Sequence, residues 1–248
     1  MLLHIPHSQK CIPDEYLQYF HLSDSDLDVE LLKMTDHFTD ELFECSQSNC
    51  SEIIFPVSRL LVDPERFVID ADEPMSARGM GCIYEKTHDQ NPLKDCRAIR
   101  QLLIDRYYAP HHVQFAALVN KELEQTNRSL IIDCHSFPKY PLPYEMDQKS
   151  DRAEICIGTD DFHTPHNLAD KVADGFDKAG FSTALNEPFT GAIVPIEHYG
   201  KTKAVNSIMI EIRRDLYMDE ASERKTENFD IVKRTIGGIL KSLAQTQK

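Results

Sequence analysis

Three residues whose types suit metal binding or acid–base catalysis lie at or near the ends of short apolar runs. His7 and His135 each follow such a run, and Glu211 lies inside the run Ile208–Ile212. A carboxylate in a buried segment is costly unless it is paired, protonated or close to a metal. Zinc hydrolases commonly use two histidines and one carboxylate as ligands and leave one position open for water. We therefore predict a hydrolytic zinc site with His7 and His135 as ligands and Glu211 as the general base.

The third zinc ligand is predicted to come from the acidic segment 34–42. If this segment is helical, Asp36 and Asp40 lie on one helical face because they are four residues apart, and His37 lies beside them. We favour Asp36 as the ligand. The alternative is that the two carboxylates only form a solvated acidic face.

Each of these residues also has a structural interpretation. A single histidine after a strand is more often a buried structural residue than a ligand, which applies to His7 and to His135 alike. Glu211 could instead form a buried ion pair with Arg213 or Arg214. The combination of the three residues favours the zinc site.

Arginines and hydrogen-bonding residues of other segments are predicted to contact a substrate. Arg66 is the main candidate, since an arginine can bind a carboxylate through two parallel hydrogen bonds. A loop from Asn186 to Gly191 leads to His198, which could act as an acid or an electrophilic group. The remaining predicted substrate contacts are Asp63, Arg78, Ser136 and Arg213. Taken singly, each segment could be an ordinary turn.

The elements that must position these residues are read from alternating apolar and amphipathic segments. Strands are predicted over 2–5, 53–57, 130–134, 155–158, 183–185 and 208–212, and helices over 26–45, 113–124, 165–179 and 229–243. The segment 70–108 is predicted to be a long loop over the site. The alternation predicts one α/β domain over residues 1–248, with a mostly parallel mixed sheet flanked by helices. In such sheets, sites form at the carboxyl ends of strands.

Composition and charge exclude several classes of partner. The formal net charge is −14, which argues against binding to nucleic acid or to anionic membranes. No apolar run approaches the ~18 residues of a membrane span, and the N-terminus does not resemble a signal peptide. The seven cysteines are scattered and form no C-x-x-C pair. We therefore expect reduced thiols in a cytoplasmic protein.

The motifs occur in an order that resembles the N-formylglutamate amidohydrolase family. In chain order they are Pro6-His7-Ser8, Asp63-Pro64-Glu65-Arg66, Asp133-Cys134-His135-Ser136, Asn186 to Gly191, and Ile210-Glu211-Ile212-Arg213. The resemblance extends over residues 4–219. It implies a fold similar to that of zinc carboxypeptidases and aspartoacylase-type deacylases, within the phosphorylase/hydrolase-like folds. It also implies a zinc-dependent amidohydrolase that cleaves the N-acyl group, typically formyl, from an acidic amino acid such as N-formyl-L-glutamate.

The sequence departs from the family pattern at three positions. Gln9 stands where the family usually has glycine, and Lys10 stands where an H-x-x-E motif would place its glutamate. Glu65 replaces the asparagine of the D-x-N-R motif of the deacylases, in which Arg66 would contact the substrate carboxylate. The third zinc ligand must therefore come from elsewhere in the chain. The alternative functions are a metallo-carboxypeptidase, a deacylase for another N-acyl amino acid, or a non-catalytic binding protein on the same scaffold.

Overall fold

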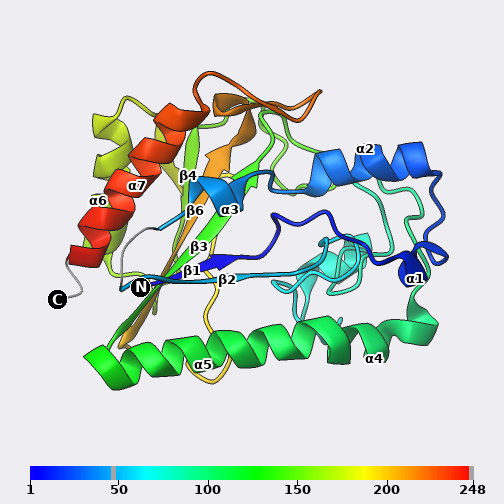
Figure 1. Cartoon of the computed structure of the whole chain (residues 1–248), viewed down its shortest axis with the longest axis horizontal. Helices are drawn as coiled ribbons and strands as arrows, with labels where there is room; N and C mark the ends of the chain where they lie inside the picture. The colour runs from blue at the N-terminus through cyan, green and yellow to red at the C-terminus, as the bar shows by residue number, and fades with distance from the viewer. Residues whose placement is uncertain (46–48, 246–248) are drawn as a thin grey trace.

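A six-stranded sheet with the strand order β2-β1-β3-β6-β4-β5 runs through the centre of the protein (Figure 1). A computed structural model describes residues 1–45 and 49–245. The strands are β1 (Leu2–Ile5), β2 (Ser51–Ile54), β3 (Ser129–Phe137), β4 (Ile155–Gly158), β5 (Thr183–Leu185) and β6 (Val205–Arg213). Neighbouring strands are parallel except for β4 and β6, which are antiparallel. The predicted mostly parallel mixed sheet is confirmed, although β2 begins earlier than predicted and β3 and β6 are longer.

Helices cover both faces of the sheet (Figure 1). They are α1 (Asp14–Leu17), α2 (Asp24–Met34), α3 (Thr39–Leu42), α4 (Arg100–Leu103), α5 (Ala109–Thr126), α6 (His166–Lys178) and α7 (Phe229–Gln245). Helix α5 packs on one face, while α3, α6 and α7 pack on the other. A short hairpin of β7 (Met218–Asp219) and β8 (Arg224–Lys225) precedes α7. Within the described ranges, no helix has both the length and the apolar character needed to cross a bilayer.

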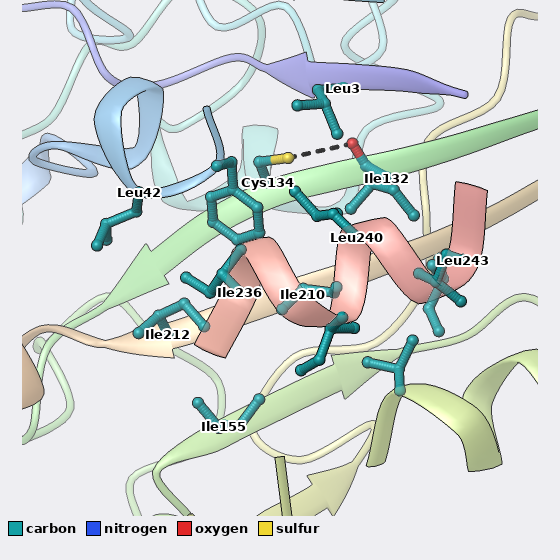
Figure 2. Close-up of a cluster of buried hydrophobic side chains, with 14 of the residues drawn as sticks. Leu3, Leu42, Ile132, Cys134, Ile155, Ile210, Ile212, Ile236, Leu240 and Leu243 are labelled. Carbon is teal, nitrogen blue, oxygen red and sulfur yellow. Dashed lines mark hydrogen bonds between the residues drawn. The ribbon is translucent and has the colours of Figure 1, made fainter. Parts of the chain in front are cut away.

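Side chains of β3 and β6 alternate between the two faces, because the side-chain period of a strand is two residues. Figure 2 shows Cys134 and Ile210 on the face that packs against Ile236 and Leu240 of α7. The Cys134 thiol donates a hydrogen bond to the Ile132 carbonyl at 3.3 Å, so this cysteine is a core residue. The intervening positions point to the opposite face, where Ile131 and Val205 pack against α5, and Asp133, His135 and Glu211 follow the same alternation.

The predicted helix over 26–45 is wrong, because the chain turns between α2 and α3. Helix α2 ends at Met34, and Phe38 adopts a left-handed conformation with φ 62°. Asp36 lies in this turn, where its backbone N–H donates to the His7 carbonyl at 3.0 Å. Asp36 and Asp40 therefore do not share a helical face. Contacts with a distant segment determine the direction of the Asp36 side chain.

The segment 70–108 is less irregular than predicted. It contains a 3₁₀ helix, Pro74–Arg78, and becomes helical again from Arg97 onwards, in continuity with α5. Its irregular part brings Tyr84 to the carboxyl end of the sheet, where the phenol donates a hydrogen bond to Asp63 Oδ2 at 2.6 Å. Part of this excursion thus contacts the residues of the predicted site.

Candidate active site

The four residues predicted to form the catalytic centre come together at the carboxyl ends of β1, β3 and β6. His7 follows β1, while His135 and Glu211 are paired neighbours on the adjacent strands β3 and β6. Asp36 reaches the same place from the turn after α2. One of its oxygens, Oδ2, lies 3.0 Å from His135 Nδ1 and 3.6 Å from His7 Nδ1. All four residues are buried.

The spacing of these atoms fits a metal ion. Zinc bonds of 2.0–2.1 Å in a tetrahedral arrangement place neighbouring ligand atoms about 3.3 Å apart, close to the two observed distances. Among residues 1–45 and 49–245, His7 Nδ1 has no hydrogen-bond partner although it is buried. The opposite nitrogen, His7 Nε2, donates to Asp63 Oδ1 at 2.9 Å. A carboxylate on the far nitrogen is typical of a metal-binding histidine. The distances from Asp36 Oδ2 to the two histidines therefore make His7, Asp36 and His135 one candidate ligand set for a divalent metal.

Glu65 is a second candidate for the carboxylate ligand. Ligand atoms of His7, Glu65 and His135 all lie within 4.8 Å of one another, and Glu65 Oε2 lies 3.1 Å from His135 Nε2. In the sequence, Glu65 stands out only as a departure from the family pattern. Its proximity to the histidines depends on the loop that follows Asp63, which local sequence patterns did not reveal.

Asp63 acts on protein groups in this structure. Its side chain is fully buried, and it accepts hydrogen bonds from His7, Tyr84 and Arg59, the last at 3.0 Å. Burial alone would raise the pKa of Asp63, but the charges of His7 and Arg59 hold this pKa well below its usual range. The Asp63 side chain therefore remains a carboxylate anion, and in this form it orients the ring of His7. Arg59, four residues earlier in the chain, was not predicted as a site residue.

Glu211 has one carboxylate oxygen without a protein partner among the described residues. This atom, Oε2, is buried and makes no hydrogen bond there. Burial raises the pKa of Glu211 to about 8; the charge of His135 opposes this, whereas the charges of Asp36 and Glu65 add to it. A carboxyl group with a pKa near neutrality can both accept and donate a proton, as a general base and acid must.

The ion-pair interpretation of Glu211 is not supported by the neighbouring arginines. Arg213 Nε donates to Asp215 Oδ1 at 2.7 Å, and Arg214 Nη2 donates to Asp36 Oδ1 at 3.2 Å. Arg213 also donates to the Arg152 carbonyl, so its guanidinium is directed away from the cluster. Arg214 instead fixes Asp36 opposite the two histidines.

Among the predicted arginine contacts, Arg66 has the guanidinium that is most available to bind a substrate. Its Nε atom is buried, finds no hydrogen-bond partner in the described part of the chain, and lies 3.8 Å from Asp63 Oδ2. The Arg66 backbone carbonyl accepts a hydrogen bond from the Tyr108 hydroxyl at 3.0 Å, which holds this segment against the helical region before α5. An anionic group could therefore bind at Arg66 without displacing a strong protein partner.

Other predicted site residues contact different partners. The ring nitrogens of His198 contact Thr202 and Asn120, the latter at 2.9 Å. Asn120 is nine residues beyond His111 on α5, which is about 13 Å along the helix axis. The structure thus does not bring His198 to the cluster. His111 itself lies against the sheet face that carries the site, where it contacts His4.

The remaining predicted contacts lie around the cluster or beyond it. Ser136 is adjacent, since its N–H donates to Asp36 Oδ2 at 3.3 Å. Arg78 donates to the Tyr144 carbonyl at 2.8 Å. The Asn186 side-chain amide pairs with Thr159, which follows β4 and lies 27 residues earlier in the chain. Gly191 has φ 95°, a conformation that favours glycine, and its carbonyl closely approaches Gly158. These last two residues thus serve the loop conformation in this structure.

Helix α5 supports the loop that carries Glu65. His112 Nε2 donates to the Pro64 carbonyl at 2.8 Å, and burial lowers the pKa of His112 to about 4. Above about pH 6.5 this histidine is neutral in both the folded and the unfolded protein. Between pH 6.5 and 4 only the unfolded protein binds the proton, so stability decreases as the pH falls.

This linkage predicts a measurable effect of His112→Gln. Glutamine can keep the hydrogen bond to Pro64 but does not titrate. As the pH falls from 7 to 4, wild type should lose about 1–3 kcal/mol more unfolding free energy than the variant. Urea unfolding at a series of pH values measures this difference. His166→Gln, at an exposed position, is the control, and equal pH slopes for wild type and His112→Gln would contradict the prediction.

Comparison with known proteins agrees with this architecture. A model of the N-formylglutamate amidohydrolase family matches residues 1–218. The crystal structure of an N-formylglutamate amidohydrolase from Ralstonia eutropha JMP134 is similar, with a TM-score of 0.82 and 22% identity, covering 99% of this chain and 92% of that one. The gene product Atu2144 from Agrobacterium tumefaciens has a TM-score of 0.63 and 20% identity, covering 98% and 91%. No curated protein matches the sequence.

Proposed function

Because the chain belongs to the N-formylglutamate amidohydrolase family, we propose that it is a zinc-dependent amidohydrolase that removes the formyl group from N-formyl-L-glutamate or a related N-acyl acidic amino acid. The observation that carries this proposal is the convergence of His7, His135 and Asp36 beside the unpartnered carboxylate of Glu211. Two histidines and one carboxylate beside a free base suit a hydrolytic zinc site.

In the proposed mechanism, His7, Asp36 and His135 hold the zinc. When bound, the ion supplies a Lewis acid that polarises the amide carbonyl and lowers the pKa of water. Asp63 fixes the ring of His7, and Arg214 fixes Asp36, so that these ligands are preorganised.

Glu211 moves the protons in this reaction. It accepts a proton from the water molecule whose oxygen forms the new bond to the formyl carbon. As the carbon–nitrogen bond breaks, Glu211 donates that proton to the leaving amine. The products are formate and the free amino acid. Arg66 binds a carboxylate of the substrate through its guanidinium, and Arg59, already paired with Asp63, contributes positive charge nearby.

The direct test is hydrolysis by protein reconstituted with zinc. We expect release of formate from N-formyl-L-glutamate or N-formyl-L-aspartate, with a lower specificity constant for N-formyl-L-glutamine. Cleavage of C-terminal residues from peptides instead would indicate a metallo-carboxypeptidase. If zinc-loaded protein hydrolyses no N-acyl amino acid and no peptide, the non-catalytic alternative is favoured.

Substrate selection by Arg66 predicts a selective loss in Arg66→Met. One charge-assisted hydrogen bond contributes about 1.5–3 kcal/mol, which is roughly 10–150-fold in kcat/KM. The loss should be much larger for N-formyl-L-glutamate than for N-formyl-L-glutamine. Arg97→Met, at an exposed arginine paired with Asp95, is the matched control. Equal losses on both substrates would remove Arg66 from the recognition of the side-chain carboxylate.

A further inference from the structure

A second group of metal-ligand residues lies on the far side of the His135 ring. His135 Nδ1 faces Asp36, whereas His135 Nε2 lies 3.1 Å from Glu65 Oε2 and 3.2 Å from Asp133 Oδ1. His4, three residues before His7, completes this second group. The two nitrogens of His135 thus face two sets of donor atoms within one buried region, and Glu65 also lies within reach of His7.

The donor atoms of His4, Glu65 and Asp133 are spaced as the ligands of an ion. His4 Nδ1 lies 2.9 Å from Asp133 Oδ1 and 3.5 Å from Glu65 Oε1, and donor atoms of all three residues lie within 4.8 Å of one another. These distances bracket the separation of about 3.3 Å expected for neighbouring ligands of a zinc-sized ion. Glu65 Oε1 and His135 Nε2 are buried, and neither makes a hydrogen bond to any residue that the structure describes.

The charge of this group is not balanced by arginine or lysine. Asp36 is paired with Arg214, and Asp63 with Arg59. By contrast, within residues 1–45 and 49–245, the only basic groups within 4.0 Å of Glu65 or Asp133 are the rings of His4 and His135. Buried carboxylates are normally paired with a cation or bound to a metal.

The two histidines cannot readily supply the missing charge if the first site is occupied. A histidine that binds a metal is neutral, so His135 on the proposed zinc contributes no positive charge. The His4 ring is held by its other nitrogen, since His4 Nε2 lies 3.0 Å from His111 Nε2. The His4 ring also stacks on Phe115 at a centroid distance of 4.8 Å. These contacts keep Nδ1 of His4 directed at the two carboxylates.

We propose that His4, Glu65 and Asp133 bind a second divalent cation beside the zinc site, separated from it by the ring of His135. This inference rests on the proposed function only in its assignment of the first ion to His7, Asp36 and His135. One imidazole and two carboxylates suit zinc or manganese. The second cation neutralises Glu65, which otherwise places a negative charge close to the site of an anionic substrate.

The stoichiometry of metal binding tests the proposal without reference to activity. Protein is freed of metal with a chelator and titrated with Zn²⁺ by equilibrium dialysis, and bound zinc is measured by mass spectrometry. We expect two ions per chain in wild type and one in each of Glu65→Gln and Asp133→Asn. Glu30→Gln removes a buried carboxylate that pairs with His88 outside the site, and this control should bind two ions.

Several outcomes would overturn the second site. A wild type that saturates at one ion contradicts it, as does either carboxylate variant that still binds two ions. A wild type with one ion and a Glu65→Gln variant with none would make Glu65 the third ligand of the first site. A wild type that binds two ions but hydrolyses no N-acyl amino acid would refute the proposed function alone.

A measurement on wild type avoids dependence on the folding of the variants. Protein loaded with Mn²⁺ should give an electron paramagnetic resonance spectrum of two coupled ions, because only the ring of His135 lies between Asp36 of the first group and Asp133 of the second. The spectrum of isolated Mn²⁺ at saturating metal would overturn the proposal. Circular dichroism of each substituted protein establishes whether its stoichiometry refers to the folded state.

Discussion

Replacement of Glu211 by glutamine is expected to lower kcat by about 10²–10⁴-fold, the usual contribution of a general base, while the protein keeps its zinc. Glutamine preserves the shape of the side chain but cannot accept the proton of the attacking water. Because Glu211 Oε2 makes no hydrogen bond in the folded protein, the substitution breaks no protein contact of that oxygen. Single-turnover kinetics and bound zinc are measured on the same preparation.

The control for this substitution is Glu30→Gln, which also removes a buried carboxylate. Glu30 accepts hydrogen bonds from the backbone and the ring of His88, so this variant should keep its kcat even if it is less stable. A Glu211→Gln variant that loses zinc would identify Glu211 as a ligand. Full activity in Glu211→Gln would require another residue as the base.

Replacement of His135 by alanine is expected to remove the zinc ion held by His7, Asp36 and His135 and, with it, nearly all hydrolysis. Zinc sites in enzymes use three protein ligands, and His135 also holds the carboxylate of Asp36 at 3.0 Å. Loss of the ring therefore removes one ligand and releases a second. Purified wild type should contain at least one zinc per chain, measured by mass spectrometry, and His7→Ala should behave in the same way as His135→Ala.

His198→Ala is an informative control for the histidine variants. His198 was predicted as a catalytic residue from its sequence position, but its ring contacts Asn120 and Thr202. We expect His198→Ala to keep its zinc and most of its activity. If His7→Ala and His135→Ala both kept the full amount of metal, the zinc site would have to lie elsewhere. A large loss of kcat with full metal in His198→Ala would restore the catalytic role of His198.

The sequence alone predicted the architecture and most of the residues that meet at the carboxyl ends of β1, β3 and β6. Apolar runs predicted the strands because burial of both sheet faces requires nearly continuous apolar residues. Strands β1, β4 and β5 have the predicted limits. His135 and Glu211 were found because a polar residue is conspicuous at the end of such a run. Their pairing across β3 and β6 follows from the parallel arrangement of strands.

The tertiary structure decided which other residues belong to the site. Asp36 was predicted as a ligand from a helix, yet it reaches His135, 99 residues away in the chain, from a turn. Hydrogen bonds to Arg214 and to the backbone of Ser136 fix its carboxylate. Helical periodicity describes only neighbours three or four residues apart, so it cannot predict contacts of this kind.

Local sequence patterns also could not predict that Glu65, Asp133 and His4 lie together. Glu65, Asp133 and His4 meet because the loop after Asp63 folds back over β1 and β3. Residue types in this loop are visible in the sequence, but the direction of each side chain depends on the strands, on α5 and on the segment around Tyr84 that surround it. These carboxylates could contact a substrate, orient a histidine or bind a cation. Distances of a few ångströms between segments far apart in sequence decide among these roles. Such distances exist only in the folded protein.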